Sequence, residues 1–358
     1  MERYREVAFA PKAAPYPLHL FPEFMELFEL TRTLVDIESI TENERAVGEY
    51  LFQHVSSLAS TTGGKVEKMD VEADRFNVFA CWGDPVVTLS THIDTVPPFF
   101  ASREDDEFIW GRGACDTKGI IAAMIFAIRQ LLEEGQRNLG LLLVVGEERN
   151  STGAECASRS GRGSKFLING EPTENKLALG SKGALRFELT THGRMAHSAY
   201  PELGDSAILK LLDILADLRR LPLPSDPVLG QSTMNIGTIS GGRAPNVIPD
   251  EARAELFIRL IDAGDLVEAQ VRQMVEGRGD LFKPLHVPAV HLGSVPGFET
   301  SIVAFTTDIP GFKGAWGKPF LFGPGSIHVA HTSQERIPKK QLVDAVPLYK
   351  RLVKHLLV

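Results

Sequence analysis

The most constraining feature of this chain is a set of short apolar segments separated by helical ones. Pro85–Ser90, Leu141–Val145 and Lys165–Ile168 are each almost continuously apolar, as expected of strands buried on both faces. Gly119–Glu134 lies between the first two and carries its apolar residues at helical spacing. This alternation predicts an α/β fold: a mixed, mostly parallel sheet flanked by helices.

Further elements extend this first domain in both directions. They are helices over Phe24–Ile40, Glu44–Leu58 and Lys340–Leu357, and strands over Gly64–Val71 and Asn77–Cys81. Residues 1–22 are rich in proline, and we expect them to form an extended arm.

A second domain is predicted between residues 182 and 292, where the pattern changes. Its expected strands are Leu185–Thr191, Ser232–Ile239, Ala252–Leu260 and Leu285–Leu292, and its helices are Asp205–Leu221 and Asp265–Val275. The order β-α-β-β-α-β is that of the ferredoxin-like split unit, an α+β fold. The first domain would then comprise residues 1–181 and 293–358, with the second inserted between them.

Composition limits the classes of function. The chain has 358 residues, of which 43% are hydrophobic, enough for more than one core. A net charge of -8 gives no electrostatic reason to bind nucleic acid or an anionic membrane. Three cysteines without CxxC spacing argue against a disulfide framework. With no secretory signal or 18-residue apolar span, we expect a cytoplasmic protein.

Polar side chains gather where the predicted strands end. His92 follows the first buried strand, and Asp94, two residues on, points the same way and can accept the second ring N–H of the histidine. Asp116 lies in a glycine-rich turn before a helix, where a carboxylate can bridge two cations. Each of these residues alone also fits an ordinary loop or helix cap.

The same pattern recurs further along the chain. Glu147 and Glu148 follow Leu141–Val145, and two adjacent carboxylates need a cation or proton to offset their repulsion. Glu171 follows Lys165–Ile168, and His331 comes after a glycine-rich loop. Nitrogen and oxygen ligands without cysteine suit catalytic zinc, with cobalt or manganese as substitutes. Five ligands with one bridging carboxylate satisfy two ions and leave Glu147 free as a general base.

The order of these motifs resembles the two-zinc aminoacylase/carboxypeptidase family, which includes acetylornithine deacetylase and succinyl-diaminopimelate desuccinylase. The resemblance spans roughly residues 25–357 and rests on Ser90–Pro97, Gly111–Gly119, Gly146–Glu148, Gly170–Thr173 and Ala330–His331. It implies two zinc ions per subunit: His92 and Glu171 on one, Glu148 and His331 on the other, and Asp116 between them. Asp94 would orient His92.

The resemblance also implies that the inserted domain is a lid that mediates homodimerisation. His197 would reach the active site of the neighbouring subunit and help to hold the scissile carbonyl. Asn246 and Arg259 would bind substrate, with Arg259 gripping a carboxylate. Gly323 and Gly325 would line the pocket floor.

The resulting hypothesis is a hydrolase that cleaves the amide bond of a small N-acyl amino acid, such as acetylornithine or acetylcitrulline. A desuccinylase, an amino-acid carrier-protein hydrolase and a dipeptidase or carboxypeptidase remain open within the same family. A two-metal phosphohydrolase and a catalytically silent binding protein are alternatives from other classes.

Overall fold

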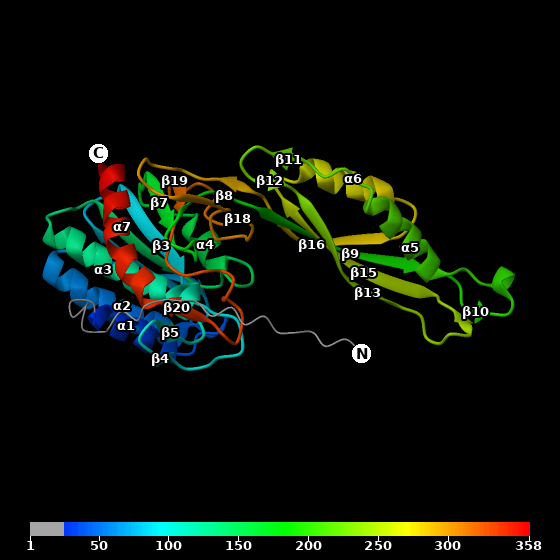
Figure 1. The fold of residues 1–358 in the computed structure, drawn as a ribbon, viewed down its shortest axis with the longest axis horizontal. Coiled ribbons are helices and arrows are strands. Elements are labelled where there is room, and N and C mark those ends of the chain that lie inside the picture. Colours follow the sequence, from blue (N-terminus) through cyan, green and yellow to red (C-terminus); the bar gives the residue numbers. More distant parts are fainter. Residues whose placement is uncertain (1–24) are drawn as a thin grey trace, which may run out of the picture.

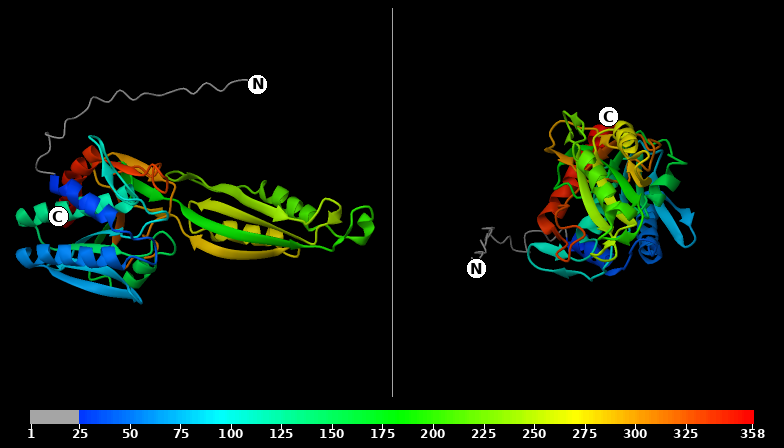
Figure 2. Two further views of the ribbon diagram at one scale, coloured as in Figure 1. Left: turned by 90° about the horizontal axis from the view of Figure 1, so that it is seen from below. Right: turned by 90° about the vertical axis from the view of Figure 1, so that its right-hand side faces the viewer.

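A computed structural model describes residues 25–358, so the predicted arm at residues 1–22 lies outside the described part of the chain. The described residues form two bodies joined end to end into an elongated molecule (Figures 1 and 2). One body is built on a nine-stranded sheet and the other on a four-stranded sheet. Each has a hydrophobic core of its own.

The large sheet is mixed, with a parallel centre. Its strands run in the order β1-β2-β6-β3-β7-β19-β8-β17, and β18 pairs with β8. The neighbours β6, β3, β7 and β19 are parallel. Their bounds are β1 Lys65–Glu72, β2 Arg75–Trp82, β3 Val87–His92, β6 Leu139–Val144, β7 Phe166–Asn169, β8 Leu177–Ser181, β17 Val290–His291, β18 Thr300–Val303 and β19 Lys318–Leu321. This arrangement confirms the predicted mixed, mostly parallel α/β sheet.

Alternate strand residues bury against helices on opposite faces of this sheet. Leu141 and Leu143 of β6 belong to the core that includes α1, α2, α3 and α7, whereas Leu142 and Val144 pack with α4 and Trp316. The helices are α1 Met25–Asp36, α2 Arg45–Thr62, α3 Gly119–Glu133, α4 Thr152–Ala157 and α7 Lys339–Leu357. Both faces of the sheet are therefore covered.

Short elements complete this body beside the sheet. A three-stranded sheet is formed by β4 Arg103–Glu104, β5 Phe108–Trp110 and β20 Arg336–Pro338. The turn η3, Ala114–Lys118, leads directly into α3. None of the helices in the described part of the chain is long and apolar enough to cross a membrane.

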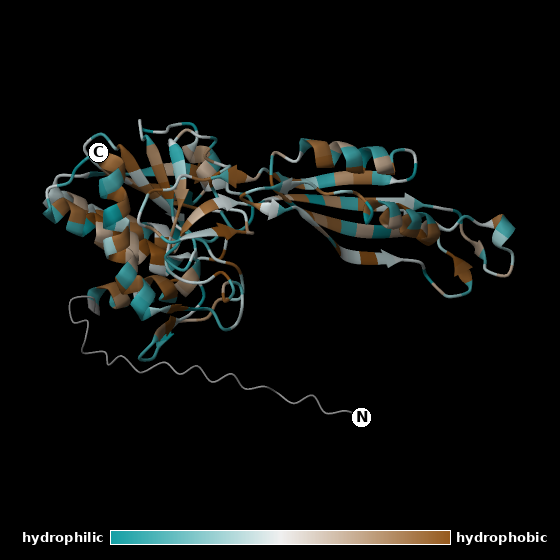
Figure 3. Ribbon diagram, turned by 45° about the horizontal axis from the view of Figure 1, so that its top comes forward, coloured by the Kyte–Doolittle hydropathy of each residue, from teal (hydrophilic) through white to brown (hydrophobic). Residues whose placement is uncertain are grey.

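The second body has the predicted β-α-β-β-α-β order. It comprises β9 Gly183–His192, α5 Ala207–Leu218, β13 Thr233–Gly241, β15 Glu251–Leu260, α6 Asp265–Val275 and β16 Asp280–Val287. The antiparallel sheet runs β13-β15-β9-β16. Buried apolar residues of α5 and α6 pack on one face of it, and brown stripes on these helices mark the apolar positions (Figure 3).

Small elements lie at both ends of this second body. At its far end are β10 Ala196–His197, the turn η4 Pro201–Leu203 and β14 Val247–Ile248, whereas β11 Ser225–Asp226 and β12 Gly230–Gln231 lie near the first body (Figure 1). The two chain segments that connect the bodies pass side by side at Gly183. A Cβ atom on Gly183 would lie 2.2 Å from the carbonyl oxygen of Val287.

Two predicted elements were wrong in extent. The expected helix over 24–40 ends at Asp36, because the backbone of Thr41 pairs instead with Thr95 beside β3. The expected strand over 285–292 is two strands. Residues 280–287 pair with β9, whereas Val290–His291 pairs with β8 in the large sheet. Because one exposed, alternating run supplies both sheets, the pattern alone could not locate the break.

Candidate metal centre

The candidate site lies at the carboxyl edge of the parallel strands. His92 is the last residue of β3 and is in register with Val144 at the end of β6, while β7 ends beside Ser90. Because parallel strands end at the same edge, the segments that follow β6 and β7 emerge next to His92. These segments carry Glu147, Glu148 and Glu171.

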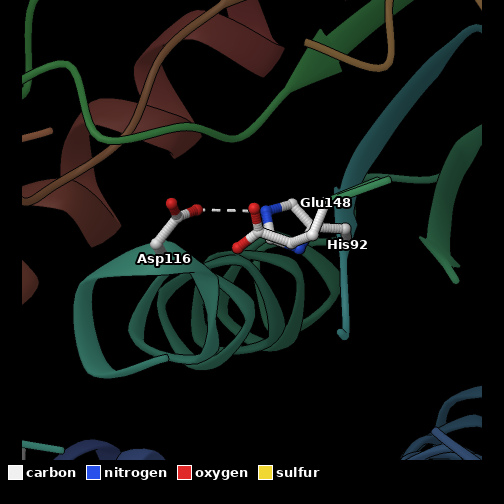
Figure 4. Close-up of side chains that lie close together, drawn as sticks. All are labelled: His92, Asp116 and Glu148. Atoms are coloured by element: carbon white, nitrogen blue, oxygen red, sulfur yellow. Dashed lines mark hydrogen bonds and ion pairs between the residues drawn. The ribbon is translucent and has the colours of Figure 1, made fainter. Parts of the chain in front are cut away.

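Asp116 lies between two histidines. Its Oδ1 is 3.0 Å from Nε2 of His92, and its Oδ2 is 3.3 Å from Nε2 of His331. His331 also lies 2.9 Å from Oε2 of Glu148. Figure 4 shows His92, Asp116 and Glu148 converging, and these three can offer ligand atoms that all lie within 4.8 Å of one another. A carboxylate with one oxygen facing each histidine is the arrangement that a bridging ligand needs.

Hydrogen bonding within this cluster separates the pKa values of its members. Burial alone would raise the pKa of Asp116, but hydrogen bonds from His331 and His92 hold it below its usual range. The same contacts with Asp116 and Glu148 raise the pKa of His331 to about 10. In the metal-free protein His331 therefore keeps a proton that a bound metal ion would have to displace.

Glu171 is buried beside this cluster. It is 3% exposed, and its Oε1 has no hydrogen-bond partner among residues 25–358. Burial raises the pKa of Glu171 well above its usual range, and nearby Asp116 adds to the rise while His92 opposes it. A buried carboxylate oxygen without a partner is costly unless a cation or proton compensates it.

Glu147 is held differently from its neighbour Glu148. No hydrogen bond joins its carboxylate to any other residue in the described range. Burial raises the pKa of Glu147 well above its usual range, with His92 opposing and Glu171 adding to the rise. A carboxylate with a raised pKa and with oxygens that no hydrogen bond engages fits a general base.

Asp94 lies next to His92, as the sequence predicts, but most of its contacts are elsewhere. The ring Nδ1 of His92 is 3.0 Å from the main-chain oxygen of Asp94 and 3.5 Å from Oδ1 of its carboxylate. The carboxylate accepts hydrogen bonds from the backbone N–H groups of Gly146, Glu147 and Glu148. Asp94 thus positions the loop that carries both glutamates, a role that the spacing of His92 and Asp94 did not reveal.

Glu335 is a second positioning residue that sequence reasoning missed. Its Oε1 accepts hydrogen bonds from the backbone N–H groups of Gly113, Cys115 and Asp116, at 2.8, 3.3 and 3.2 Å. Its Oε2 accepts one from Arg112 at 2.5 Å. Because Glu335 follows His331 by four residues, it ties the segment that carries His331 to the turn that carries Asp116.

Asp308 is a third missed residue. It is fully buried, and neither carboxylate oxygen has a hydrogen-bond partner within residues 25–358. Burial raises its pKa to about 7, with further contributions from Asp94 and Glu148 that His92 opposes. In the sequence it is a lone acidic residue two positions before Pro310 and resembles part of an ordinary turn.

His197 and Asn246 are not brought to this centre. They lie together at the far end of the second body, where β10 pairs with β14 and Ser198 donates to the main-chain oxygen of Asn246. Figure 1 shows β10 at the opposite end of the molecule from β3. Within one chain, these two residues are separate from the metal centre.

Arg259, Gly323 and Gly325 lie nearer to the metal centre. Arg259 is half-buried and lines a pocket of about 400 Å³ together with Thr173 and Ser326. Gly323 and Gly325 support the segment after β7: the carbonyl groups of Gly323 and Gly325 accept hydrogen bonds from the N–H groups of Thr173 and Glu174. Neither glycine lines that pocket, so the structure gives them a supporting place in the fold.

The fold and this donor set define a two-domain hydrolase with a metal-binding centre. A peptidase M20 domain-containing protein of Schizosaccharomyces pombe is 39% identical to this chain over 346 residues, which cover 93% of this chain and 86% of that protein. The chain belongs to the peptidase M20 family and is a peptidase-type hydrolase.

Other comparisons agree with this assignment. A probable carboxypeptidase of Aspergillus terreus is 38% identical over 365 residues, covering 90% of this chain and 84% of that protein. Residues 179–278 match the model of the peptidase dimerisation domain, the body that the sequence predicted as an insert.

Solved structures share the fold at low sequence identity. Aminopeptidase PepT of Bacillus cereus superposes with a TM-score of 0.78 at 20% identity, covering 93% of this chain and 98% of that one. The YXEP protein of Bacillus subtilis, described as a dinuclear metal-binding peptidase, gives a TM-score of 0.67 at 17% identity, covering 91% and 96%. They confirm the expected architecture.

Proposed function

We propose that this protein is a two-metal hydrolase that cleaves the amide bond of a small N-acyl amino acid. The observation that carries the proposal is Asp116, whose two oxygens face His92 and His331, while no hydrogen bond within residues 25–358 engages the nearby carboxylate of Glu147. Small peptides contain the same bond, and relatives of this chain include proteins named as probable carboxypeptidases. Acetylornithine, acetylcitrulline and succinylated diamino acids remain candidate substrates within this class, as do carrier-protein conjugates and dipeptides.

The donor set fits two divalent ions. His92 and Glu171 would hold one ion, Glu148 and His331 the other, and Asp116 would bridge them. The partnerless Oε1 of Glu171 supports this assignment, and nitrogen and oxygen donors suit zinc, with cobalt or manganese in its place. When bound, such ions polarise a water molecule and the substrate carbonyl.

The chain's own residues supply the proton transfers. Glu147 would take a proton from the attacking water and return it to the leaving amine. Asp94 would keep Glu147 in place through its three backbone hydrogen bonds. His92, held by the main-chain oxygen of Asp94, would present a fixed ring nitrogen to the centre.

Glu147→Ala tests this role. We expect kcat to fall by roughly 10²–10⁴-fold, because the proton acceptor is lost, while metal content measured by atomic absorption stays unchanged. The control is Glu155→Ala, which removes an exposed carboxylate on α4. Activity of Glu147→Ala at the wild-type level would exclude Glu147 as the base.

A phosphohydrolase is less well supported. That reaction needs cations free to stabilise a phosphoryl group. Arg112 is bound to Glu335, Lys118 donates to the carbonyl of Ile37, and Arg149 pairs with Glu42. The cationic side chains nearest in sequence to the candidate ligands are therefore already engaged.

We further propose that the protein acts as a homodimer in which the second body is a lid. In that assembly His197 and Asn246 would complete the active site of the neighbouring subunit, which accounts for their distance from their own metal centre. The match to the dimerisation domain supports this assembly. The cytoplasmic location and the domain limits at residues 181 and 292 remain predictions.

A further inference from the structure

We infer that the pocket beside the metal centre selects an apolar amino-acid side chain over a basic one, next to the substrate carboxylate that the family resemblance already assigns to Arg259. This inference rests on the proposed function and narrows its substrate class. The pocket has a volume of about 400 Å³, within the range of small-ligand sites.

The pocket shares two loops with the candidate metal centre. Pro172 and Thr173 directly follow Glu171, and Ser326–His328 precede His331 by three residues. The two loops are joined by a β-bridge between Thr173 and Ser326. A substrate whose amide bond lies at the metal centre would therefore place one of its flanking groups in this pocket.

The charges that line the pocket leave one cation without a partner. Lys176 and Glu174 form an ion pair of 3.1 Å, and Ser326 donates to the other carboxylate oxygen of Glu174 at 3.0 Å. Arg259 makes no ion pair or side-chain hydrogen bond within residues 25–358, and its guanidinium lies 4.8 Å from the ring centre of Phe257.

The unpaired Arg259 favours a carboxylate ligand. Burial lowers the pKa of Arg259, which reflects the cost of removing this cation from water. A substrate carboxylate would offset that cost with paired hydrogen bonds from the planar guanidinium. An α-carboxylate is the anion that every free carboxyl-terminal amino acid offers.

Much of the pocket lining is apolar. Ile302, Val303, Ala304 and Phe305, from β18 and the residues after it, contribute to it together with Ile327. Ile302 is 48% exposed although it is a large aliphatic residue. A substrate side chain that covers this apolar lining gains about fourfold in affinity for each methylene group removed from water.

A basic side chain finds no counterpart among the lining residues. Glu174 is the one carboxylate in the pocket, and Lys176 and Ser326 occupy its oxygens. The ammonium group of ornithine would have to leave water without an anionic partner while lying near Arg259 and Lys176. Acetylornithine should therefore be a poorer substrate than acetyl-leucine or acetyl-phenylalanine.

The test compares N-acetyl derivatives of leucine, phenylalanine, norleucine, alanine and ornithine with the full-length, metal-loaded enzyme. We expect kcat/KM for the leucine derivative to exceed that for the ornithine derivative by at least about tenfold, and norleucine to exceed alanine. Equal or higher kcat/KM for the ornithine derivative would overturn the inference but not the proposed function. If the enzyme hydrolyses neither these compounds nor dipeptides, both this inference and the proposed function are wrong.

Two variants locate the selectivity in the pocket. Arg259→Gln should lower kcat/KM for acetyl-leucine by roughly 10²-fold, the loss of one charged hydrogen-bonded contact, and leave that for acetyl-leucinamide unchanged. Ile302→Asp should favour acetyl-ornithine over acetyl-leucine. The matched control is Phe282→Asp, which changes a 63% exposed apolar residue of β16 outside the pocket. If Ile302→Asp behaves like this control, the apolar lining does not select the substrate.

Discussion

At the residue scale, the position of Asp116 depends on Glu335, which lies 219 residues further along the chain. Glu335 holds three backbone N–H groups of the turn and neutralises Arg112, and both side chains are almost fully buried. A residue that orients a metal ligand influences metal affinity without touching the ion.

Glu335→Gln should therefore weaken metal binding by about 10–100-fold. The amide retains one acceptor for the turn but loses the ion pair with Arg112. Metal affinity can be measured by competition with a chromophoric chelator, independently of activity. Gln334→Ala, which changes the exposed neighbouring side chain, is the control, and an unchanged affinity in Glu335→Gln would contradict a positioning role.

The titration of His331 predicts how metal affinity depends on pH. Its pKa is raised from 6.5 to about 10 in the metal-free protein, first by its hydrogen bond with Asp116. Because a metal ion binds only neutral imidazole, binding must displace this proton. Affinity should rise with pH, by up to about tenfold per unit, until pH approaches 10. Chelator competition across this range, with proton release followed by calorimetry, measures the effect.

The same shift contributes to the pH dependence of stability in the metal-free protein. A folded-state pKa above the unfolded value stabilises the fold below pH 6.5, and this contribution is lost as pH rises towards 10. Lys118, whose pKa is lowered to about 7 by burial, acts in the opposite direction over much of this range. The melting temperature of the metal-free protein should therefore decline more, or rise less, across this range than that of metal-free His331→Ala, and equal pH profiles would contradict the assignment.

Individual site residues differed in how far the sequence could predict them. His92, Glu148 and Glu171 follow buried strands, whose apolar runs are visible in the sequence. Neither Glu335 nor Asp308 follows such a run. The groups around each of them come from distant parts of the chain, and their burial depends on the finished fold. The main contacts of Asp94 were missed for the same reason.

At the element scale, the loop between β6 and α4 carries both Glu147 and Glu148 and is held at each end by Asn77. The fully buried side chain of Asn77 donates to the carbonyl of Gly153 at 2.8 Å and accepts from the N–H of Val145 at 3.1 Å. Asp94 holds the middle of the same loop. The loop is thus fixed by strand β2 and by the segment that follows β3.

Asn77→Ala should destabilise the protein by about 2–4 kcal/mol, since it leaves two buried backbone groups without partners. Urea unfolding measures the change in free energy. Asn150→Ala, which removes an exposed amide in the same loop, should be nearly neutral. A change below about 0.5 kcal/mol in Asn77→Ala, the size typical of a surface substitution, would mean that water replaces these hydrogen bonds.

Sequence patterns suffice to predict the bounds of some helices and strands. The mostly apolar helix α3 and strand β6 are each within two residues of their predicted bounds, because extensive burial leaves a long apolar run. β16 and β17 come from a partly exposed run. Tertiary pairing alone decides which sheet each part of that run joins.

At the scale of the whole molecule, the metal centre belongs to the first body of an elongated chain (Figure 2), and the tip that carries His197 and Asn246 lies at the far end of the second body (Figure 1). If each site takes its His197 from the neighbouring subunit, an active centre combines Glu147 of one chain with His197 of the other. Each subunit then contributes residues to both active sites of the dimer.

Hybrid dimers test this arrangement. Glu147→Ala and His197→Ala should each lower activity as homodimers, but a hybrid with one subunit of each kind should recover about half of the wild-type activity. One of its sites then combines the intact Glu147 with the intact His197. Differently tagged subunits allow the hybrid to be purified. Hybrid activity no higher than that of the parent variants would show that His197 does not act across subunits.

The pairing of the two connecting segments at Gly183 has a mechanical consequence. The backbone of Gly183 lies close to that of Val287, and Asp226 of β11 adds a contact to His291 of the large sheet. Rotation of a rigid body about such a connection requires changes in only a few backbone torsion angles. We therefore expect any rotation of the second body to use the backbone around Gly183 and to break the contact between Asp226 and His291.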